Sequence, residues 1–113
     1  MKRICTFMLS ALALPLSLSA QTTTPPTGYK MVWSDEFNGT SLDTKVWNIE
    51  ENGNGGGNQE LQYYRKENVA VANGNLVLTA RRENYNNKQF TSGRINSLDK
   101  AYFKHGIIQA RIK

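Results

Sequence analysis

The amino-acid sequence predicts an all-β protein built as an antiparallel β-sandwich. From residue 29 onward, short segments alternate apolar and polar residues, and turn-forming residues separate them at close spacing. No segment in that part of the chain keeps the 3.6-residue apolar period of an amphipathic helix. Sandwiches of this kind commonly contain about 200–250 residues in one domain. We therefore expect the 113 residues to be the first part of such a domain.

The first twenty residues have the organisation of an export signal. The basic residues Lys2 and Arg3 precede an apolar run that ends in small residues suited to signal peptidase. The run is too short to span a bilayer comfortably, and Pro15 interrupts it. We therefore expect residues 1–20 to be a cleaved signal peptide rather than a membrane span, and the mature protein to be secreted or periplasmic.

Charge and cysteine content exclude several functions. The formal net charge is +5, but the basic residues are scattered rather than gathered on one face, so we expect no nucleic-acid partner. The single cysteine, Cys5, lies in the expected signal peptide, which leaves no disulfide or thiol chemistry in the exported part. The single histidine, His105, cannot form a His/Cys zinc cluster. We expect it to be an exposed turn residue.

The elements after the signal follow in order. Residues 21–28 are polar and contain two adjacent prolines, which predicts a short extended linker. Candidate strands come next at residues 30–33 and 46–50, with the turn-forming stretch 38–41 between them.

The strongest local signal is a hairpin. Residues 69–72 and 76–80 flank Asn73-Gly74-Asn75, and residues 76–80 alternate between two faces, one of them formed by Leu76, Leu78 and Ala80. An Asn-Gly pair supplies the positive φ angles that a tight hairpin turn requires. Residues 90–97 and 106–113 alternate in the same way, which predicts further strands.

The glycine-rich stretch 53–57 does not fit a phosphate-binding loop. Such loops follow a strand, precede a helix and, in the P-loop, contain a lysine. Here an acidic, strand-like segment, 58–64, follows instead. The glycines favour a tight turn or the close approach of a ligand to the backbone.

Carbohydrate is a better partner for the segment that follows. Sugar sites combine aromatic rings with planar amides, carboxylates and arginine. On a strand, Asn58, Glu60 and Gln62 would line one face, and Arg94 would share a face with Asn96. An ordinary solvated strand face is the competing interpretation.

No pair of catalytic carboxylates can be assembled from these residues. Glycoside hydrolysis needs two carboxylates that converge on the scissile bond. The acidic residues at 35–36 and at 50–51 are adjacent, so on a strand the members of each pair point to opposite faces.

Five motifs follow one another in a characteristic order. They are residues 32–43 with Trp47, then 58–63, 75–80, 91–95 and 106–113. Each motif by itself is weak, but the five in register resemble glycoside hydrolase family 16, and most closely its laminarinase-like branch of endo-β-1,3-glucanases. The resemblance covers nearly all of residues 29–113.

The resemblance implies a jelly-roll sandwich of the concanavalin A-like kind, whose concave face binds a polysaccharide. In the family, a glutamate nucleophile and a glutamate acid/base lie on one strand in the pattern Glu-x-Asp-x-(x)-Glu, and cleavage retains configuration. The chain lacks this pattern. Residues 29–113 would then be the N-terminal part of a domain, truncated before the catalytic strand, with no catalytic residue and no activity alone.

The whole protein would accordingly be a secreted, monomeric endo-hydrolase of β-1,3- or mixed β-1,3/1,4-glucan. A non-catalytic β-glucan-binding protein of the same fold is the alternative, because binding and catalysis share the cleft residues that are present. A related specificity, for agar, carrageenan or xyloglucan, is a third interpretation.

The resemblance also assigns binding residues. Asn58 and Arg94 match positions that bind sugars on the non-reducing side of the cleavage point, and Glu60 is a less secure match. Many members bind a structural Ca²⁺ through main-chain carbonyls, which correspond here to Glu36 and Gly74, and through an aspartate that this chain lacks. The site would therefore be incomplete, and ordinary turn and strand chemistry also explains both residues. No cofactor is expected for catalysis.

Overall fold

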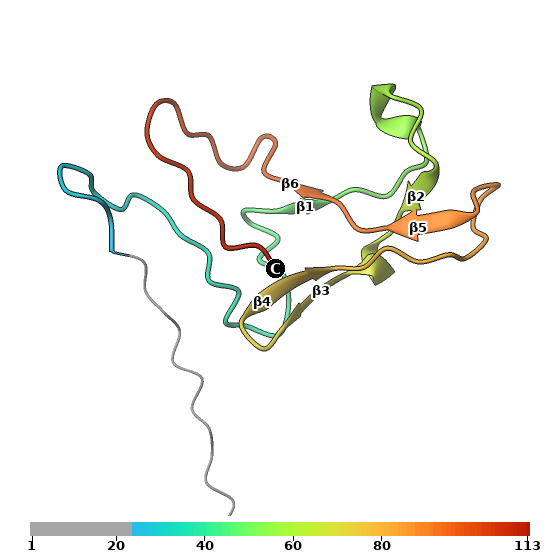
Figure 1. Ribbon diagram of the computed structural model, residues 1–113, viewed down its shortest axis with the longest axis horizontal. Helices are drawn as coiled ribbons and strands as arrows, with labels where there is room; N and C mark the ends of the chain where they lie inside the picture. The colour runs from blue at the N-terminus through green and yellow to red at the C-terminus, as the bar shows by residue number, and fades with distance from the viewer. Residues whose placement is uncertain (1–23) are drawn as a thin grey trace, which may run out of the picture.

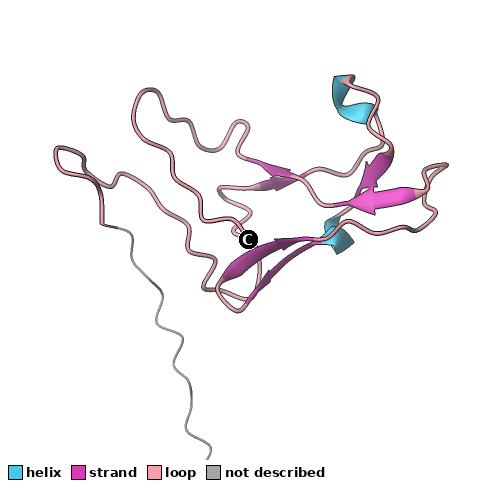
Figure 2. Cartoon of the chain, viewed as in Figure 1, coloured by secondary structure: helices cyan, strands magenta, loops and turns pink. Residues whose placement is uncertain are grey.

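The computed structural model describes residues 24–113, so the expected signal peptide lies outside the described residues. Within them the regular structure is almost entirely β, and loops connect its short elements (Figures 1 and 2). The strands and 3-10 helices are β1 (Asn48–Ile49), η1 (Gly55–Gly57), β2 (Gln62–Tyr64), η2 (Lys66–Asn68), β3 (Val69–Ala72), β4 (Asn75–Leu78), β5 (Phe90–Ser92) and β6 (Ile95–Asn96). In this part of the chain, no helix is long and apolar enough to cross a membrane.

Strands β3 and β4 form the predicted hairpin. They pair antiparallel, with Val69 opposite Leu78 and Ala72 opposite Asn75. The turn consists of Asn73 and Gly74 alone, with φ angles of 52° and 70°, as a two-residue turn with positive φ at both positions requires. The hairpin prediction is confirmed, with Asn75 in the strand rather than in the turn.

The other two strand pairs join segments that are far apart in the sequence. β1 and β6 pair antiparallel, whereas β2 and β5 pair parallel. The parallel pair departs from the expectation of purely antiparallel pairing. It is possible because the β3–β4 hairpin and the loop after it form a long connection between β2 and β5, which lets the chain enter β5 in the same direction (Figure 1).

The predicted strand over residues 90–97 is divided into β5 and β6 at Gly93. A Cβ atom on Gly93 would lie 2.5 Å from the carbonyl oxygen of Asn68 and 2.9 Å from Cγ2 of Val69. Only glycine allows the backbones of the two segments to approach so closely. The break therefore places the end of β5 against the point where η2 ends and β3 begins.

Two strand predictions were wrong. Residues 30–33 and 106–113 are not strands in the structure, and their side chains are largely exposed. Alternating polarity is compatible with a strand, but a strand also needs a ladder of backbone hydrogen bonds to a neighbouring strand, and neither segment belongs to a strand pair among the described residues. The prediction for residues 46–50 is confirmed only at its centre, where β1 forms.

The expected linker and the histidine can be placed in part. Within residues 24–28 the chain bends, and the Tyr29 amide donates to the Pro26 carbonyl at 3.0 Å, so this part is a turn rather than fully extended. His105 is exposed in a bend before Gly106 and has a φ angle of 67°. The prediction of an exposed turn residue is confirmed.

The most deeply buried side chains are polar. Asn68 is 1% exposed and Thr91 is fully buried. The Asn68 amide donates to the Thr79 carbonyl at 2.7 Å and to the Thr91 hydroxyl at 3.0 Å, and that hydroxyl donates to Glu83. Buried polar groups are tolerated when they are hydrogen-bonded in this way. This cluster fixes β5 against the base of the hairpin.

A second cluster is aromatic. Trp33 packs edge-on against Trp47, with ring centroids 5.7 Å apart, and also contacts Phe103 at 5.5 Å. The Trp47 indole N–H donates to the Asp35 carboxylate at 2.8 Å. The cluster joins the beginning of the described chain to its last part. Trp33 remains 37% exposed, so the rings are packed together without being enclosed.

Candidate functional site

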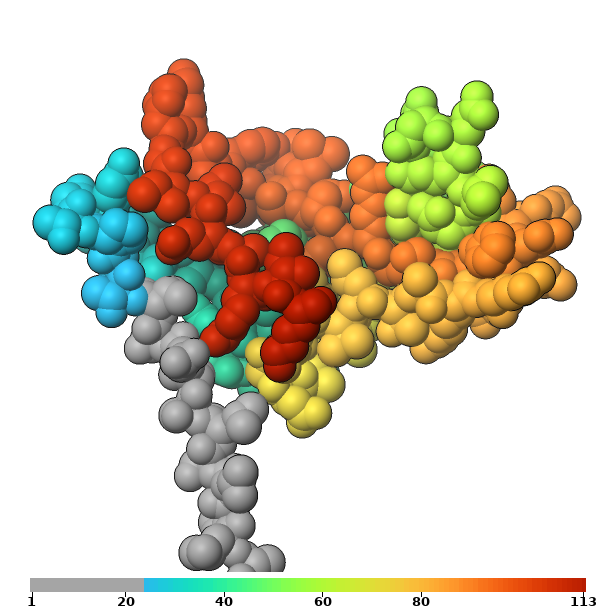
Figure 3. All heavy atoms as spheres, viewed as in Figure 1, coloured from blue at the N-terminus to red at the C-terminus, as the bar shows by residue number. Residues whose placement is uncertain are grey.

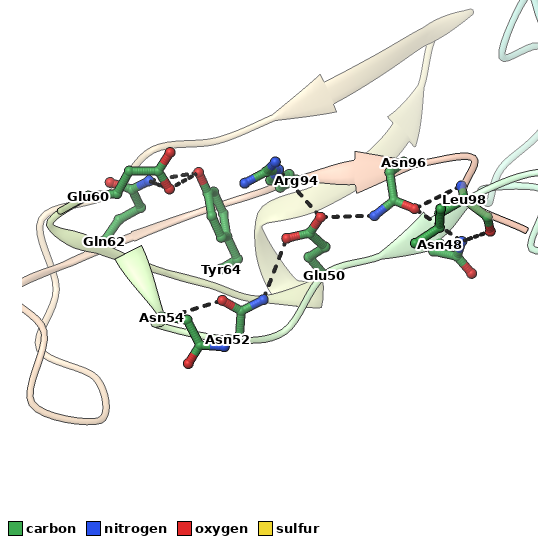
Figure 4. Close-up of polar contacts among 10 residues, drawn as sticks. All are labelled: Asn48, Glu50, Asn52, Asn54, Glu60, Gln62, Tyr64, Arg94, Asn96 and Leu98. Carbon is green, nitrogen blue, oxygen red and sulfur yellow. Dashed lines mark hydrogen bonds and ion pairs between the residues drawn. The ribbon is translucent and has the colours of Figure 1, made fainter. Parts of the chain in front are cut away.

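Two groups of hydrogen-bonded polar side chains, one at β1 and β6 and the other at β2, lie in a row (Figure 4). We call this row the polar strip. Its members are Asn48, Glu50, Asn58, Glu60, Gln62, Tyr64, Arg94 and Asn96. The loop that contains η1 projects from the surface (Figure 3).

One half of the polar strip is set by the β1–β6 register. Asn48 lies opposite Asn96, and the Glu50 amide donates to the Arg94 carbonyl at 2.9 Å just beyond the strands. Side chains at paired positions lie on the same face. The Glu50 carboxylate therefore lies 3.4 Å from Nε of Arg94, and it accepts a hydrogen bond from the Asn96 amide at 2.9 Å.

The other half is built on alternate residues of one strand and the turn before it. The Tyr64 hydroxyl donates to Glu60 at 2.7 Å, and the Gln62 amide donates to Glu60 at 3.1 Å and to the Tyr64 oxygen at 2.8 Å. Alternate residues of an extended chain share a face. The prediction that Glu60 and Gln62 lie on one face is confirmed.

Burial of the phenol, followed by its hydrogen bond to the Glu60 carboxylate, raises the pKa of Tyr64 above its ordinary value of 10.0. Tyr64 therefore remains a neutral donor at neutral pH. Its ring also joins the two halves, because the guanidinium carbon of Arg94 lies 5.5 Å from the ring centroid, within the range of a cation–π interaction.

Asn58 lies at the end of η1 and not on a strand, so that part of the prediction was wrong. The three glycines of η1 all have positive φ and turn the chain before β2 begins. When the Asn58 amide is oriented with its nitrogen toward Glu60 and the Gly55 carbonyl, it donates to them at 3.1 Å and 2.9 Å, respectively. Asn58 is thus joined to the other members of the polar strip through Glu60.

The glycine-rich loop lies against the same carboxylate. A Cβ atom on Gly56 would be 2.7 Å from the carboxylate of Glu60. The only helical turn in the loop, η1, has three residues, which does not provide the helix of a phosphate-binding loop. In the structure the absence of a side chain at Gly56 makes room for Glu60.

The structure thus brings together the three predicted binding residues, Asn58, Glu60 and Arg94. No pattern in the sequence indicates that Glu50 belongs with them. Glu50 and Glu51 do point in different directions, as their adjacency implied, since Glu51 accepts a hydrogen bond from the Lys66 amide at 3.5 Å instead. Only the pairing of β1 with β6 reveals which of the two carboxylates faces Arg94.

The two carboxylates of the polar strip have different partners. Glu50 is engaged by Arg94 and Asn96, whereas Glu60 is engaged by Tyr64 and Gln62. Arg94 and Tyr64 lie between them (Figure 4). The arrangement is suited to hold a polar ligand rather than to place two carboxylates on one bond.

The predicted Ca²⁺ ligands lie in neighbouring segments. A Cβ atom on Gly74 would be 3.6 Å from Oδ1 of Asn38, so the hairpin turn lies beside the loop that contains Glu36. Main-chain and amide oxygens are suitable ligands for Ca²⁺. The nearby Asp35 carboxylate is already used by the Phe37 amide and the Trp47 indole. Among residues 24–113, no three His, Cys, Asp or Glu side chains converge on a metal position.

Comparison with known proteins defines the class. Residues 8–113 match the family described as beta-glucan synthesis-associated protein SKN1/KRE6/Sbg1. The described fold is similar to the catalytic domain of an endo-1,3-beta-glucanase (laminarinase) from Thermotoga petrophila RKU-1, with a TM-score of 0.63 and 39% identity over 68% of this chain. The chain therefore belongs to this family, and it is a laminarinase-like member of glycoside hydrolase family 16.

Two curated relatives are similar to this chain. The alpha subunit of clotting factor G from Tachypleus tridentatus is 48% identical over 74% of this chain, and a beta-glucanase from Rhodothermus marinus is 37% identical over all of it. The chain spans only 12% and 41% of the length of these two relatives, and 34% of the Thermotoga petrophila structure.

Proposed function

We propose that the chain forms one wall of a β-glucan-binding cleft in a family 16 hydrolase. The complete protein would cleave internal β-1,3- or mixed β-1,3/1,4-glucan bonds with retention of configuration. The observation that supports this most directly is the polar strip, in which Asn58, Glu60 and Arg94 lie in one connected row. Relatives named as glucanases support the same substrate class.

The chemistry of the polar strip matches that of a sugar. Hexose units present hydroxyl groups that both donate and accept hydrogen bonds, and they present apolar C–H faces. The strip offers amides, carboxylates, a guanidinium group and a phenol ring. The Arg94 side chain remains 44% exposed, so a ligand can reach it from solvent.

Catalysis is assigned to residues outside this chain. The sequence contains no Glu-x-Asp-x-(x)-Glu pattern, and Glu50 and Glu60 are held by other side chains. We therefore expect the 113-residue chain alone to release no reducing sugar from β-glucan.

The test uses the intact protein with laminarin as substrate. Release of reducing ends and NMR detection of the β-anomer as the first product would support a retaining hydrolase. The Arg94→Ala variant should raise KM roughly 10- to 100-fold, the loss expected for hydrogen bonds from a charged group, and should change kcat less. Absence of both binding and hydrolysis of laminarin and mixed-linkage glucan would overturn the proposal.

A non-catalytic β-glucan-binding protein is the second candidate. It is favoured by the family description, which names glucan synthesis, and by the clotting-factor relative, which is not named as a hydrolase. Saturable binding of laminarin by the intact protein without release of reducing ends would support this candidate over the first.

Three further properties are proposed with the function. Cleavage after residue 20 would make the protein secreted or periplasmic, and N-terminal sequencing of the mature protein tests this. A structural Ca²⁺ held in part by the carbonyls of Glu36 and Gly74 would raise the Tm on addition of CaCl₂ to chelator-treated protein. A monomer would be recognised by light scattering at several concentrations.

A further inference from the structure

We infer that Glu50 is a positioning residue that holds the Arg94 guanidinium in the orientation needed to bind the glycan. This inference rests on the proposed function and assigns Glu50 a role within the same site. The Glu50 carboxylate lies 3.4 Å from Nε of Arg94. An ion pair with a carboxylate restrains the guanidinium at Nε.

Glu50 is itself held in place. The Asn96 amide donates to Oε1 of Glu50 at 2.9 Å, and the Asn52 amide approaches Oε2 at 3.5 Å. Asn52 is in turn held by the backbone amide of Asn54, which donates to it at 3.1 Å. The Glu50 side chain is only 24% exposed. A restrained carboxylate can orient a neighbouring arginine, whereas a freely rotating one cannot.

Arg94 has a second restraint on its other side. Its guanidinium carbon lies 5.5 Å from the centroid of the Tyr64 ring, and the Tyr64 hydroxyl is fixed by Glu60 at 2.7 Å. Arg94 is therefore held between a carboxylate from the β1 side and an aromatic ring from β2 (Figure 4). A long arginine side chain loses much conformational freedom when it binds a ligand. Restraint before binding reduces that loss.

A purely structural role for Glu50 would predict that removal of its charge lowers the Tm, whereas a positioning role predicts a loss of affinity for the glycan. The Arg94 side chain is 44% exposed, and ion pairs with an exposed partner contribute little to folding stability. Removal of the Glu50 charge should therefore leave the Tm nearly unchanged and should act on the affinity for the glycan. Direct contact of Glu50 with the sugar would instead give a loss of affinity that does not depend on Arg94.

A double-mutant cycle on the intact protein separates these roles. The KM for laminaritetraose, or its dissociation constant by calorimetry if the intact protein binds without cleaving it, is measured for the wild type, Glu50→Gln, Arg94→Ala and the double variant. We expect Glu50→Gln to weaken binding about 3- to 30-fold, within the coupling range of interacting residues. In the Arg94→Ala background the same change should have less than about a two-fold effect. Glu51→Gln is the matched control and should change neither affinity nor Tm.

A measurement without ligand completes the test. In NMR relaxation of the Arg94 Nε–H group, Glu50→Gln should increase the mobility of this group, and Glu51→Gln should not. Additive losses in the cycle, or unchanged Arg94 mobility, would overturn the positioning role while leaving the proposed function intact. A folded wild type that does not bind laminaritetraose would instead count against the proposed function.

Discussion

The β3–β4 hairpin and the polar strip are built in opposite ways. The hairpin is formed by residues that are contiguous in the chain, and its ladder closes around a two-residue turn. The polar strip joins residues up to 48 positions apart, such as Asn48 and Asn96. Most side chains of the hairpin are apolar, and one of them, Leu78, is 48% exposed. The strip instead consists of polar side chains that form hydrogen bonds and ion pairs with one another.

This difference separates stability from binding. The side chains that hold Glu50, Glu60 and Arg94 belong to β2, β6 and the adjoining loops rather than to the hairpin. Changes to the hairpin should therefore alter the free energy of unfolding and leave the affinity for glucan intact, whereas changes to the strip should act mainly on the affinity and cost less stability. Substitutions in the intact protein can test this separation, beginning with a position that lies beside both regions.

Gly93→Ala should have the largest effect, because Gly93 lies between β5 and β6 and contacts the base of the hairpin. The new Cβ would meet the Asn68 carbonyl at 2.5 Å and Cγ2 of Val69 at 2.9 Å. Such overpacking lowers the free energy of unfolding by about 1–3 kcal/mol. Both the stability and the affinity for glucan should therefore fall. Chemical denaturation and calorimetry measure the two losses.

Gly39→Ala is the control for this change, since its Cβ would meet nothing closer than 3.7 Å. Unaltered stability of Gly93→Ala would show that the close approach at Gly93 does not hold the two regions together.

Gly74→Ala should have a smaller effect that is confined to the hairpin. Gly74 has a φ of +70°, a left-handed conformation that costs a residue with a side chain about 1–2 kcal/mol. We expect the midpoint of urea denaturation to fall and the dissociation constant of laminaritetraose to stay the same. An equal loss of affinity would show that the hairpin and the polar strip are coupled.

Tyr64→Phe should have the smallest effect on stability at neutral pH, about 0.5–1.5 kcal/mol for the lost hydrogen bond to Glu60. Because the pKa of Tyr64 is raised, its contribution to stability depends on pH. The folded state favours the neutral phenol, so the contribution is fully present below the ordinary value of 10.0 and is lost as the pH rises through the higher pKa of the folded protein.

The stability difference between wild type and Tyr64→Phe should accordingly be constant near neutral pH and should narrow above about pH 10. Denaturation series at several pH values measure it. Parallel pH profiles for the two proteins would contradict the assignment of the raised pKa to Tyr64.

The sequence was most informative where structure depends on neighbours in the chain. The Asn73-Gly74 turn followed from the φ angles that these two residues accept, and the common face of Glu60 and Gln62 followed from strand alternation. Residues 106–113 show the limit of the same reasoning. Their alternation is as regular, yet they form no strand among the described residues, because alternation does not supply a pairing partner.

The pattern of this chain indicated its β class and its turn positions, and its motifs indicated its family by resemblance. The tertiary structure decided which strands pair, that β2 and β5 run parallel, and that Glu50 rather than Glu51 faces Arg94. The physical reason lies in the two-residue period of a strand. The period fixes which side chains share a face, whereas the register between distant strands is set by the packing of the whole chain.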